Sequence, residues 1–253
     1  MISVPSINQK RDYYVVKSND LARHSIYSLS SQQQKLILYF ISKIRPLDEK
    51  DTLYTITIQE FCDICGIDKS NGTNYINIKN NLERIDNIKA WILRDKECER
   101  FQWFNRLIIS PNNGTIQVSF HHTIWNELYD LHQRYTRYQL VNVLPMRSKY
   151  SIRIYELCAS YRYTGTFEMS LDEFRKVIGV KDEDDEKYAK NSHLKLRILD
   201  RAQKEINNFT DLYISYTLIK DSRSYKYISF MIKEKTPLEG ALAHHKQRER
   251  LNR

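Results

Sequence analysis

An internal repeat constrains the fold of this chain more than any other feature. Residues 57–67 read TIQEFCDICGI and residues 170–180 read SLDEFRKVIGV, so five apolar positions coincide and Gly66 matches Gly179. Apolar residues one helical turn apart, followed by a glycine, are typical of a short helix that ends in a left-handed cap. We therefore expect the same short helix to occur twice.

The surroundings of the two copies repeat as well. Each copy is preceded by a serine that can cap an amphipathic helix, Ser30 or Ser148, and then by a short β-prone stretch. Each copy is followed by a longer amphipathic helix, expected over residues 73–88 and 192–207. β-Rich stretches follow both of these helices, so the whole order of elements is duplicated.

The order helix, strand, helix, turn, helix, hairpin is that of the winged helix-turn-helix. The sequence therefore predicts an α+β fold with two tandem winged-helix domains related by internal duplication, and chance alternation of helices and strands is the competing explanation. A boundary near Pro145–Arg147 would separate an N-terminal domain (13–145) from a C-terminal domain (146–235). The basic segment 238–253 is expected to be a disordered phosphate-binding tail or a solvated chain end.

The net charge favours a polyanionic partner. The chain has 40 Lys and Arg against 31 Asp and Glu, a net charge of +9, and nucleic acid is the commonest polyanion. Arginine matches guanine in the major groove and lysine suits phosphate, although an ordinary solvated helix face could carry the same residues. The candidate DNA-binding residues of the second half are Lys195, Arg197, Arg201, Lys204 and Asn208 on the long helix, and Lys220, Arg223 and Lys226 at the hairpin.

The long helix of the first half has no net charge. Its polar face is rich in asparagine, with Asn74, Asn77 and Asn81 as candidate DNA-binding residues. Asparagine can read adenine, but a neutral helix gains little from phosphate electrostatics. We therefore assign the main DNA readout to the C-terminal domain. Backbone contacts, weaker readout or dimerisation are assigned to the N-terminal domain.

Two motifs invite a metal-binding or catalytic interpretation. Cys62 and Cys65 lie in the repeated short helix, where Cys65 matches Ile178, so core packing is the expected role. His121 and His122 are adjacent, so on a strand they would point to opposite faces, unlike the metal site of a nicking enzyme. A phosphate-binding loop motif is absent from the sequence. We expect a protein without catalytic residues, metal or cofactor.

Composition also indicates the compartment. No apolar stretch is long enough to cross a bilayer, and the N-terminus lacks the apolar core of a secretory signal. Four cysteines in a chain of this length do not suggest a disulfide framework. A reducing cytoplasm, without membrane association, is expected.

Five stretches in a fixed order cover most of residues 13–232. They are VVKSNDL (15–21), SSQQQKLIL (30–38), YTRYQL (135–140), SKYSIRIYEL (148–157) and ILDRAQKEIN (198–207). In order and spacing they resemble the plasmid replication initiators of the tandem winged-helix, Rep_3-type family. The resemblance implies binding of double-stranded DNA at directly repeated origin sites (iterons) and local melting of the origin in the bacterial cytoplasm. It also implies recruitment of the host initiator and replicative helicase, and a monomer–dimer equilibrium through the N-terminal domain.

A non-enzymatic origin-binding initiator is the leading hypothesis, and two alternatives stay open. One is a winged-helix transcriptional repressor or partition-type DNA binder, and the other is a rolling-circle nicking enzyme. Evenly spaced direct repeats in a footprint favour initiation, whereas a single inverted repeat favours repression. A covalent tyrosyl–DNA product would establish the nicking enzyme.

Overall fold

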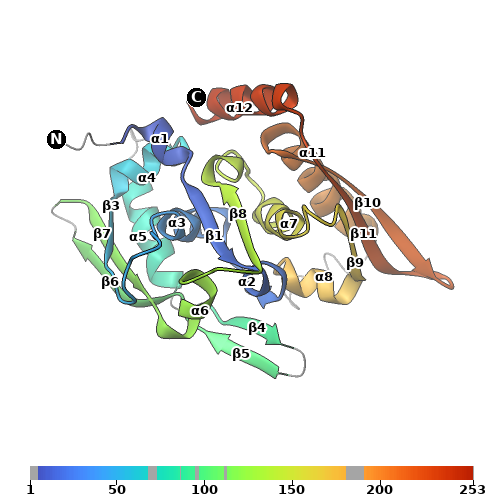
Figure 1. Cartoon of the computed structure of the whole chain (residues 1–253), viewed down its shortest axis with the longest axis horizontal. Coiled ribbons are helices and arrows are strands. Elements are labelled where there is room, and N and C mark those ends of the chain that lie inside the picture. Colours follow the sequence, from blue (N-terminus) through green and yellow to red (C-terminus); the bar gives the residue numbers. More distant parts are fainter. Residues whose placement is uncertain are drawn as a thin grey trace.

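The computed structural model describes residues 5–67, 73–85, 87–94, 97–110, 113–180 and 191–252, and Figure 1 shows the arrangement of its helices and strands. The first half contains α1 (Ile7–Arg11), β1 (Tyr14–Ser18), α2 (Asn19–Arg23), β2 (Ser25–Ile26), α3 (Ser31–Ile41), β3 (Tyr54–Thr57), α4 (Ile58–Cys65), α5 (Thr73–Ile85), β4 (Ala90–Arg94), β5 (Glu97–Phe101), β6 (Phe104–Ser110), β7 (Thr115–Phe120), η1 (His122–Ile124), α6 (Trp125–Leu128), β8 (Tyr135–Gln139) and η2 (Leu140–Asn142). The second half contains α7 (Lys149–Ser160), β9 (Thr166–Ser170), α8 (Leu171–Val177), α10 (Asn191–Leu194), η4 (Lys195–Leu199), α11 (Asp200–Phe209), β10 (Leu212–Asp221), β11 (Ser224–Glu234) and α12 (Pro237–Leu251). None of the helices in these ranges has the length and apolar character needed to cross a membrane.

The repeated short helix is present in both halves, as predicted. Helix α4 is capped by Thr57 and α8 by Ser170, and each side-chain oxygen accepts a hydrogen bond from the backbone N–H of the third helical residue. Gly66 follows α4 with φ 63°, and Gly179 lies just beyond α8 with φ 76°. A side chain is strained in this left-handed region, so glycine suits both turns.

The strands repeat with the same topology. The sheet order is β3-β7-β6 in the first half and β9-β11-β10 in the second. In both halves the strand before the short helix therefore pairs with the second strand of the hairpin. This correspondence confirms the duplicated winged-helix fold. The β4–β5 hairpin, which pairs with β2, is an insertion of the first half without a counterpart among the described elements of the second.

Helix α7 lies between the two halves (Figure 1). It packs against α2, α3 and β8 on one side and against α11 on the other, and all its residues from Tyr150 to Ser160 are buried. Residues 140–146, where the sequence places the domain boundary, are buried too. The segment that connects the two halves is therefore buried in the core, and the domain boundary at residue 145 stays a prediction.

A buried ionic network crosses this junction. Lys17 of β1 pairs with Glu156 of α7, and each side chain is 1% exposed. Glu156 also accepts hydrogen bonds from Tyr138 Oη at 2.6 Å and from Arg153 Nη1 at 3.0 Å. Burial lowers the pKa of Lys17 to about 8 despite the attraction of Glu156. Burial alone would raise the pKa of Glu156, but Lys17 and Arg153 together hold it below its ordinary value.

The C-terminal segment is a helix, so the prediction of a disordered tail is wrong. Helix α12 begins with a capping box, in which Thr236 and Glu239 exchange side-chain to backbone hydrogen bonds. Ala243, Gln247 and Leu251, spaced by four residues, are buried. This stripe contains one small and one polar residue, so its apolar periodicity is too weak to recognise in the sequence.

Candidate nucleic-acid interface

The recognition position of the second winged helix is occupied by the continuous helix of α10, η4 and α11 (Asn191–Phe209). Its inner side chains are buried as predicted, namely Leu194, Ile198, Leu199, Ala202 and Ile206. Segment η4 is π-helical, and the Asp200 N–H donates to the Lys195 carbonyl five residues earlier. A π turn inserts one residue, so the regular helical spacing expected from the sequence does not hold across 195–199.

The outer face of this helix is basic and open to solvent. Lys195, Arg197, Arg201 and Lys204 are all exposed. Arg201 Nε lies 3.7 Å from Glu205 Oε1, but the arginine side chain is half exposed and such a pair contributes little. Among the described residues, no acid lies within ion-pair distance of Arg197 or Lys204. Four of the five candidate residues of this helix are therefore accessible to solvent.

Asn208, the fifth candidate on this helix, lies against α12. Its Nδ2 donates to the Lys204 carbonyl at 2.9 Å, and its Oδ1 accepts from Lys246 Nζ at 3.3 Å. Both ends of the amide are thus engaged. The geometry gives Asn208 a role in joining α11 to α12 rather than in presenting an amide to solvent.

The hairpin β10–β11 projects well beyond the rest of the molecule (Figure 1). The sequence predicts strands over 212–219 and 225–232 joined by residues 220–224, but both strands run further and the turn between them is Ser222–Arg223. Lys220 therefore lies on a strand and not in the connection, with its Nζ 5.2 Å from the ring centroid of Tyr225. Lys220, Arg223 and Lys226 are exposed near the tip. We use the term wing for this hairpin.

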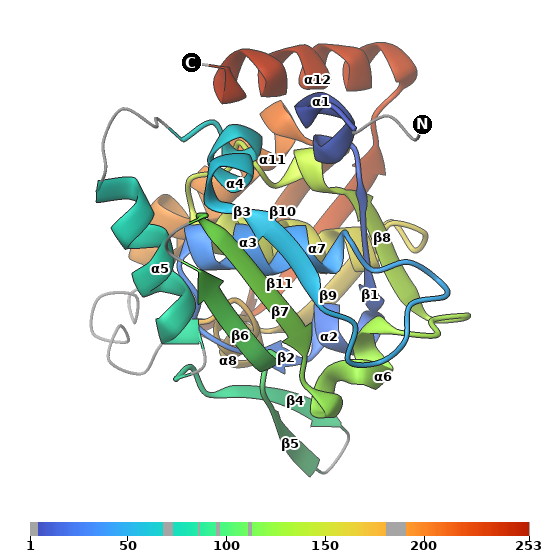
Figure 2. The same ribbon diagram turned by 90° about the vertical axis from the view of Figure 1, so that its left-hand side faces the viewer.

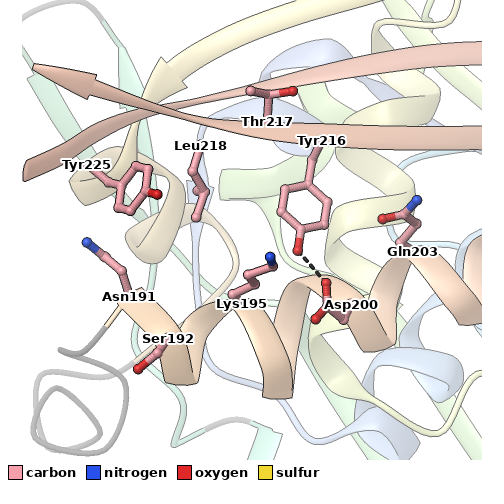
Figure 3. Close-up of a pocket in the computed structure, with 9 residues that line it drawn as sticks. All are labelled: Asn191, Ser192, Lys195, Asp200, Gln203, Tyr216, Thr217, Leu218 and Tyr225. Carbon is pink, nitrogen blue, oxygen red and sulfur yellow. Dashed lines mark hydrogen bonds between the residues drawn. The ribbon is translucent and has the colours of Figure 1, made fainter.

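A groove separates the recognition helix from the wing (Figure 3). Lys195, Asp200 and Gln203 extend toward the strands, and the Tyr216 hydroxyl donates to the Asp200 carboxylate. Burial, reinforced by Asp200, raises the pKa of Tyr216, so the phenol keeps its proton and ties the wing to the helix. Tyr216 is not among the candidate residues that the sequence indicates. Alternation along β10, which puts Tyr216 on the same face as the buried Ile214, could have revealed it.

Helix α5 occupies the corresponding position in the first half. Of the four side chains that the periodicity places inward, Ile78, Leu82 and Ile85 are buried, and that of Tyr75 lies outside the described residues. Asn77 is exposed, whereas Asn81 is partly buried and its Nδ2 donates to Gln32 Oε1. The side chain of Asn74 and the acidic stretch 181–190 lie outside the described residues. Within the part of α5 that the structure describes, Asn77 is the candidate residue most open to DNA.

The cysteine and histidine motifs take up structural positions. Cys62 and Cys65 are buried in α4, and burial raises the pKa of Cys65 to about 12. The expectation that His121 and His122 face opposite ways is wrong, because β7 ends before them and His121 caps η1. Their ring centroids lie 4.1 Å apart. Across the described ranges, no group of three His, Cys, Asp or Glu residues is placed to hold a metal ion.

The duplicated topology and the exposed basic helix define a tandem winged-helix protein. Residues 14–159 match the family model described as initiator replication protein, WH1, and residues 170–232 match the one described as initiator Rep protein, WH2. The chain belongs to this family of replication initiator proteins. The match confirms the resemblance noted in the sequence.

Relatives and a solved structure agree with this assignment. Over 209 residues the chain is 25% identical to a replication initiation protein of Escherichia coli, covering 78% of this chain and 63% of that protein. Over 81 residues it is 31% identical to a probable replication protein rep of Bifidobacterium longum (strain NCC 2705), covering 32% and 27% respectively. The chain therefore spans less than two thirds of the length of these two relatives. The crystal structure of the Pi initiator protein in complex with iteron DNA has the same fold, with a TM-score of 0.68 and 19% identity over 89% of this chain and 99% of that one.

Proposed function

We propose that this protein is a plasmid replication initiator that binds directly repeated double-stranded DNA sites (iterons) at an origin. Binding would promote origin opening and recruitment of the host initiator and replicative helicase. The observation that carries the proposal is the exposure of Lys195, Arg197, Arg201 and Lys204 on the helix in the recognition position of a winged helix. Membership of the initiator family supports it, as does the fold shared with a protein crystallised on iteron DNA.

The proposed contacts follow from the chemistry of the exposed groups. A major groove accepts a helix, and the forked guanidinium groups of Arg197 and Arg201 match the two acceptors of guanine. Lys195 and Lys204 suit phosphates, and Asn208, which accepts a hydrogen bond from Lys246 of α12, supports the end of α11. The cations of the wing would reach a neighbouring stretch of phosphate backbone. The Tyr216–Asp200 hydrogen bond keeps helix and wing in a fixed relation, so both sets of contacts form together.

The first winged helix is proposed to add weaker contacts and to mediate dimerisation. Helix α5 and the residue after it carry no net charge, because Glu83 and Asp86 balance Lys79 and Arg84. Asn77 is placed to contact a base edge or the backbone, and we keep Asn74 and Asn81 as weaker candidates. A monomer–dimer equilibrium through residues 13–145 would then regulate the number of molecules that occupy the repeats.

The proposed action is DNA binding without catalysis, metal or cofactor, in the bacterial cytoplasm. Incubating the protein with supercoiled origin DNA and then denaturing the mixture tests this directly. Unbroken DNA without attached protein is expected. A tyrosyl–DNA adduct would instead establish a nicking enzyme.

Selection of bound sequences from a random DNA pool, followed by footprinting, tests the proposal as a whole. We expect one enriched motif and, on the cognate plasmid origin, evenly spaced direct repeats of it. A single inverted repeat would indicate a repressor, and no enrichment would overturn specific recognition. The double variant Arg197→Ala/Lys204→Ala should lose enrichment. Its matched control, Lys79→Ala/Arg84→Ala, removes the same charge from α5 and should retain the motif.

A further inference from the structure

Each repeated glycine is approached by backbone from the other half of the chain. A Cβ on Gly66 would lie 2.4 Å from the Leu251 carbonyl oxygen, and one on Gly179 would lie 2.3 Å from that of Tyr27. Positive φ does not by itself bring a neighbour so close, because Gly114 has φ 62° and no atom within 4 Å of its Cβ position. Both equivalent glycines therefore mark a site into which another segment docks.

We call the first of these sites the first socket; it consists of Gly66, Arg11 and the last carbonyl groups of α4. Arg11 is 4% exposed. Its Nε donates to the Ile64 carbonyl at 3.0 Å, and its Nη2 donates to the Asp63 carbonyl at 2.7 Å. The same Nη2 lies 3.3 Å from the Leu251 carbonyl oxygen at the end of α12. A guanidinium between the carbonyl ends of two helices complements both helix dipoles and holds the ends together.

The second socket, formed by Gly179 and Arg153 at the end of α8, has the same plan. Arg153 is 1% exposed, and its Nε donates to the Val177 carbonyl at 3.2 Å. In the sequence repeat Val177 corresponds to Ile64, whose carbonyl accepts the hydrogen bond from Arg11 Nε. Arg153 Nη2 donates to the Ser25 carbonyl at 3.1 Å. Ser25 lies in the same segment as Tyr27, whose carbonyl oxygen approaches Gly179. The two sockets thus receive segments from opposite halves of the chain.

Helix α12 extends the first socket to the recognition helix. Figure 2 shows α12 lying across α1 and α11, close to α4. The Gln247 side chain, which is 2% exposed, donates to the Phe209 carbonyl at the end of α11 and to Asn142 Oδ1 at 3.0 Å. The Arg250 guanidinium lies 4.6 Å from the ring centroid of Phe209. The end of α11 is therefore joined through α12 to the end of α4, the helix that precedes α5.

We propose that the two sockets fix the relative orientation of the winged-helix domains, and that Arg11 and Gly66 are positioning residues for DNA binding. This inference rests on the proposed function. Rotation of one domain against the other would break buried hydrogen bonds to arginine at both sockets. Helices α5 and α11 are therefore held at a fixed distance. The DNA segments that these two helices contact must then be separated by a fixed number of base pairs. Each inserted base pair turns one segment by about 35° relative to the other.

The orientation is measurable in the full chain without DNA. Spin labels on Ile76→Cys in α5 and Leu196→Cys in η4, which are 57% and 68% exposed, report the distance between the two helices. A Cys98→Ser background removes the exposed cysteine, and the other three cysteines are buried. We expect a narrow distance distribution that broadens in Gly66→Ala, Arg11→Lys and Gln247→Ala. Gly114→Ala is the matched control, because it imposes the same positive-φ strain without a docked neighbour.

The positioning role is measurable on DNA selected by the wild-type protein. Inserting base pairs between the segments that α5 and α11 protect should weaken wild-type binding by about tenfold or more, because the second contact is lost. The socket variants should bind the intact site more weakly and lose much less on insertion. Loss of folded protein alone would lower affinity for both DNAs equally, so the ratio of the two affinities separates positioning from stability.

Each result decides a different point. Unchanged distance distributions in all three variants that retain native circular dichroism would overturn the sockets. Unfolding of Gly66→Ala leaves the decision to Arg11→Lys and Gln247→Ala, which remove hydrogen bonds without adding bulk. Broadened distributions with an unchanged insertion ratio would overturn the positioning role. If the wild-type protein selects no DNA, the proposed function fails, while the distances still decide whether the sockets orient the domains.

Discussion

Replacing Glu156 with glutamine tests whether the buried ionic network stabilises the junction between the halves. The carboxylate is 1% exposed and faces Lys17 and Arg153, which are equally buried. Glutamine keeps the volume of the side chain but removes its charge, so two buried cations lose their counter-charge. Removing one partner of a buried pair typically costs about 3–5 kcal/mol. That loss is a large fraction of the roughly 5–15 kcal/mol by which natural proteins are stable.

Two companion variants separate charge from packing. Lys17→Met/Glu156→Gln removes one charge of each sign, and we expect it to recover part of the loss, because Arg153 is then the one cation of the network left without its carboxylate. Glu83→Gln breaks the pair with Lys79, whose side chains are 54% and 42% exposed. This surface pair should contribute less than about 0.5 kcal/mol.

Urea unfolding at pH 7, followed by circular dichroism and tryptophan fluorescence, measures these differences. The reasoning is refuted if Glu156→Gln is no less stable than Glu83→Gln. It is also refuted if the double variant is no more stable than the single one, because the loss would then come from packing and not from unpaired charge.

Three further predictions concern pH and DNA. The folded pKa of Glu156 lies below its unfolded value near 4.5. Its contribution to the free energy of unfolding is therefore complete above pH 4.5 and is lost as the pH falls through the folded pKa. The urea midpoint of the wild type should drop more steeply in acid than that of Glu156→Gln, and parallel curves would contradict this. Arg201→Ala should weaken binding to the selected site by about 1–3 kcal/mol and relax the preference at one base pair, whereas equal losses on random DNA would argue against a base contact. Lys220→Ala should lower affinity for every sequence and reduce the slope of log affinity against log salt by about one; an unchanged slope would remove the wing from the proposed contacts.

Much of the fold could be predicted because its signals act over a few residues. Ser30 and Ser148 cap α3 and α7, as expected from their positions before amphipathic stretches. Gly66 and Gly179 end the repeated turns in the left-handed conformation. The inner faces of the two long helices follow apolar periodicity, which does not depend on knowing the partner.

The remaining features depend on contacts between distant segments. Arg11 gives no local sign of burial, because the carbonyl that its Nε meets lies 53 residues away. The position of Asn208 against α12 and the bond from Tyr216 to Asp200 likewise require the tertiary arrangement. The π turn at 195–199 places two adjacent apolar residues inward, and a regular 3.6-residue pattern does not specify where such a turn occurs.

The two sockets explain why the repeated short helix can be recognised in the sequence, whereas the segments that dock into the sockets cannot. A socket is built from a glycine without a side chain and from backbone carbonyl groups, so the docked segment needs only a backbone of suitable direction, such as that of Leu251 or Tyr27. Both copies therefore carry the glycine, whereas the residues that meet it, Leu251 and Tyr27, have nothing in common in sequence. A fixed orientation of the two domains also changes how much a weak DNA contact adds to the binding affinity. Helix α5 is neutral and would bind little DNA alone, but held rigidly beside α11 its contact forms at a high effective concentration. The orientation of the domains, more than the affinity of α5 itself, would then set the benefit of the second winged helix.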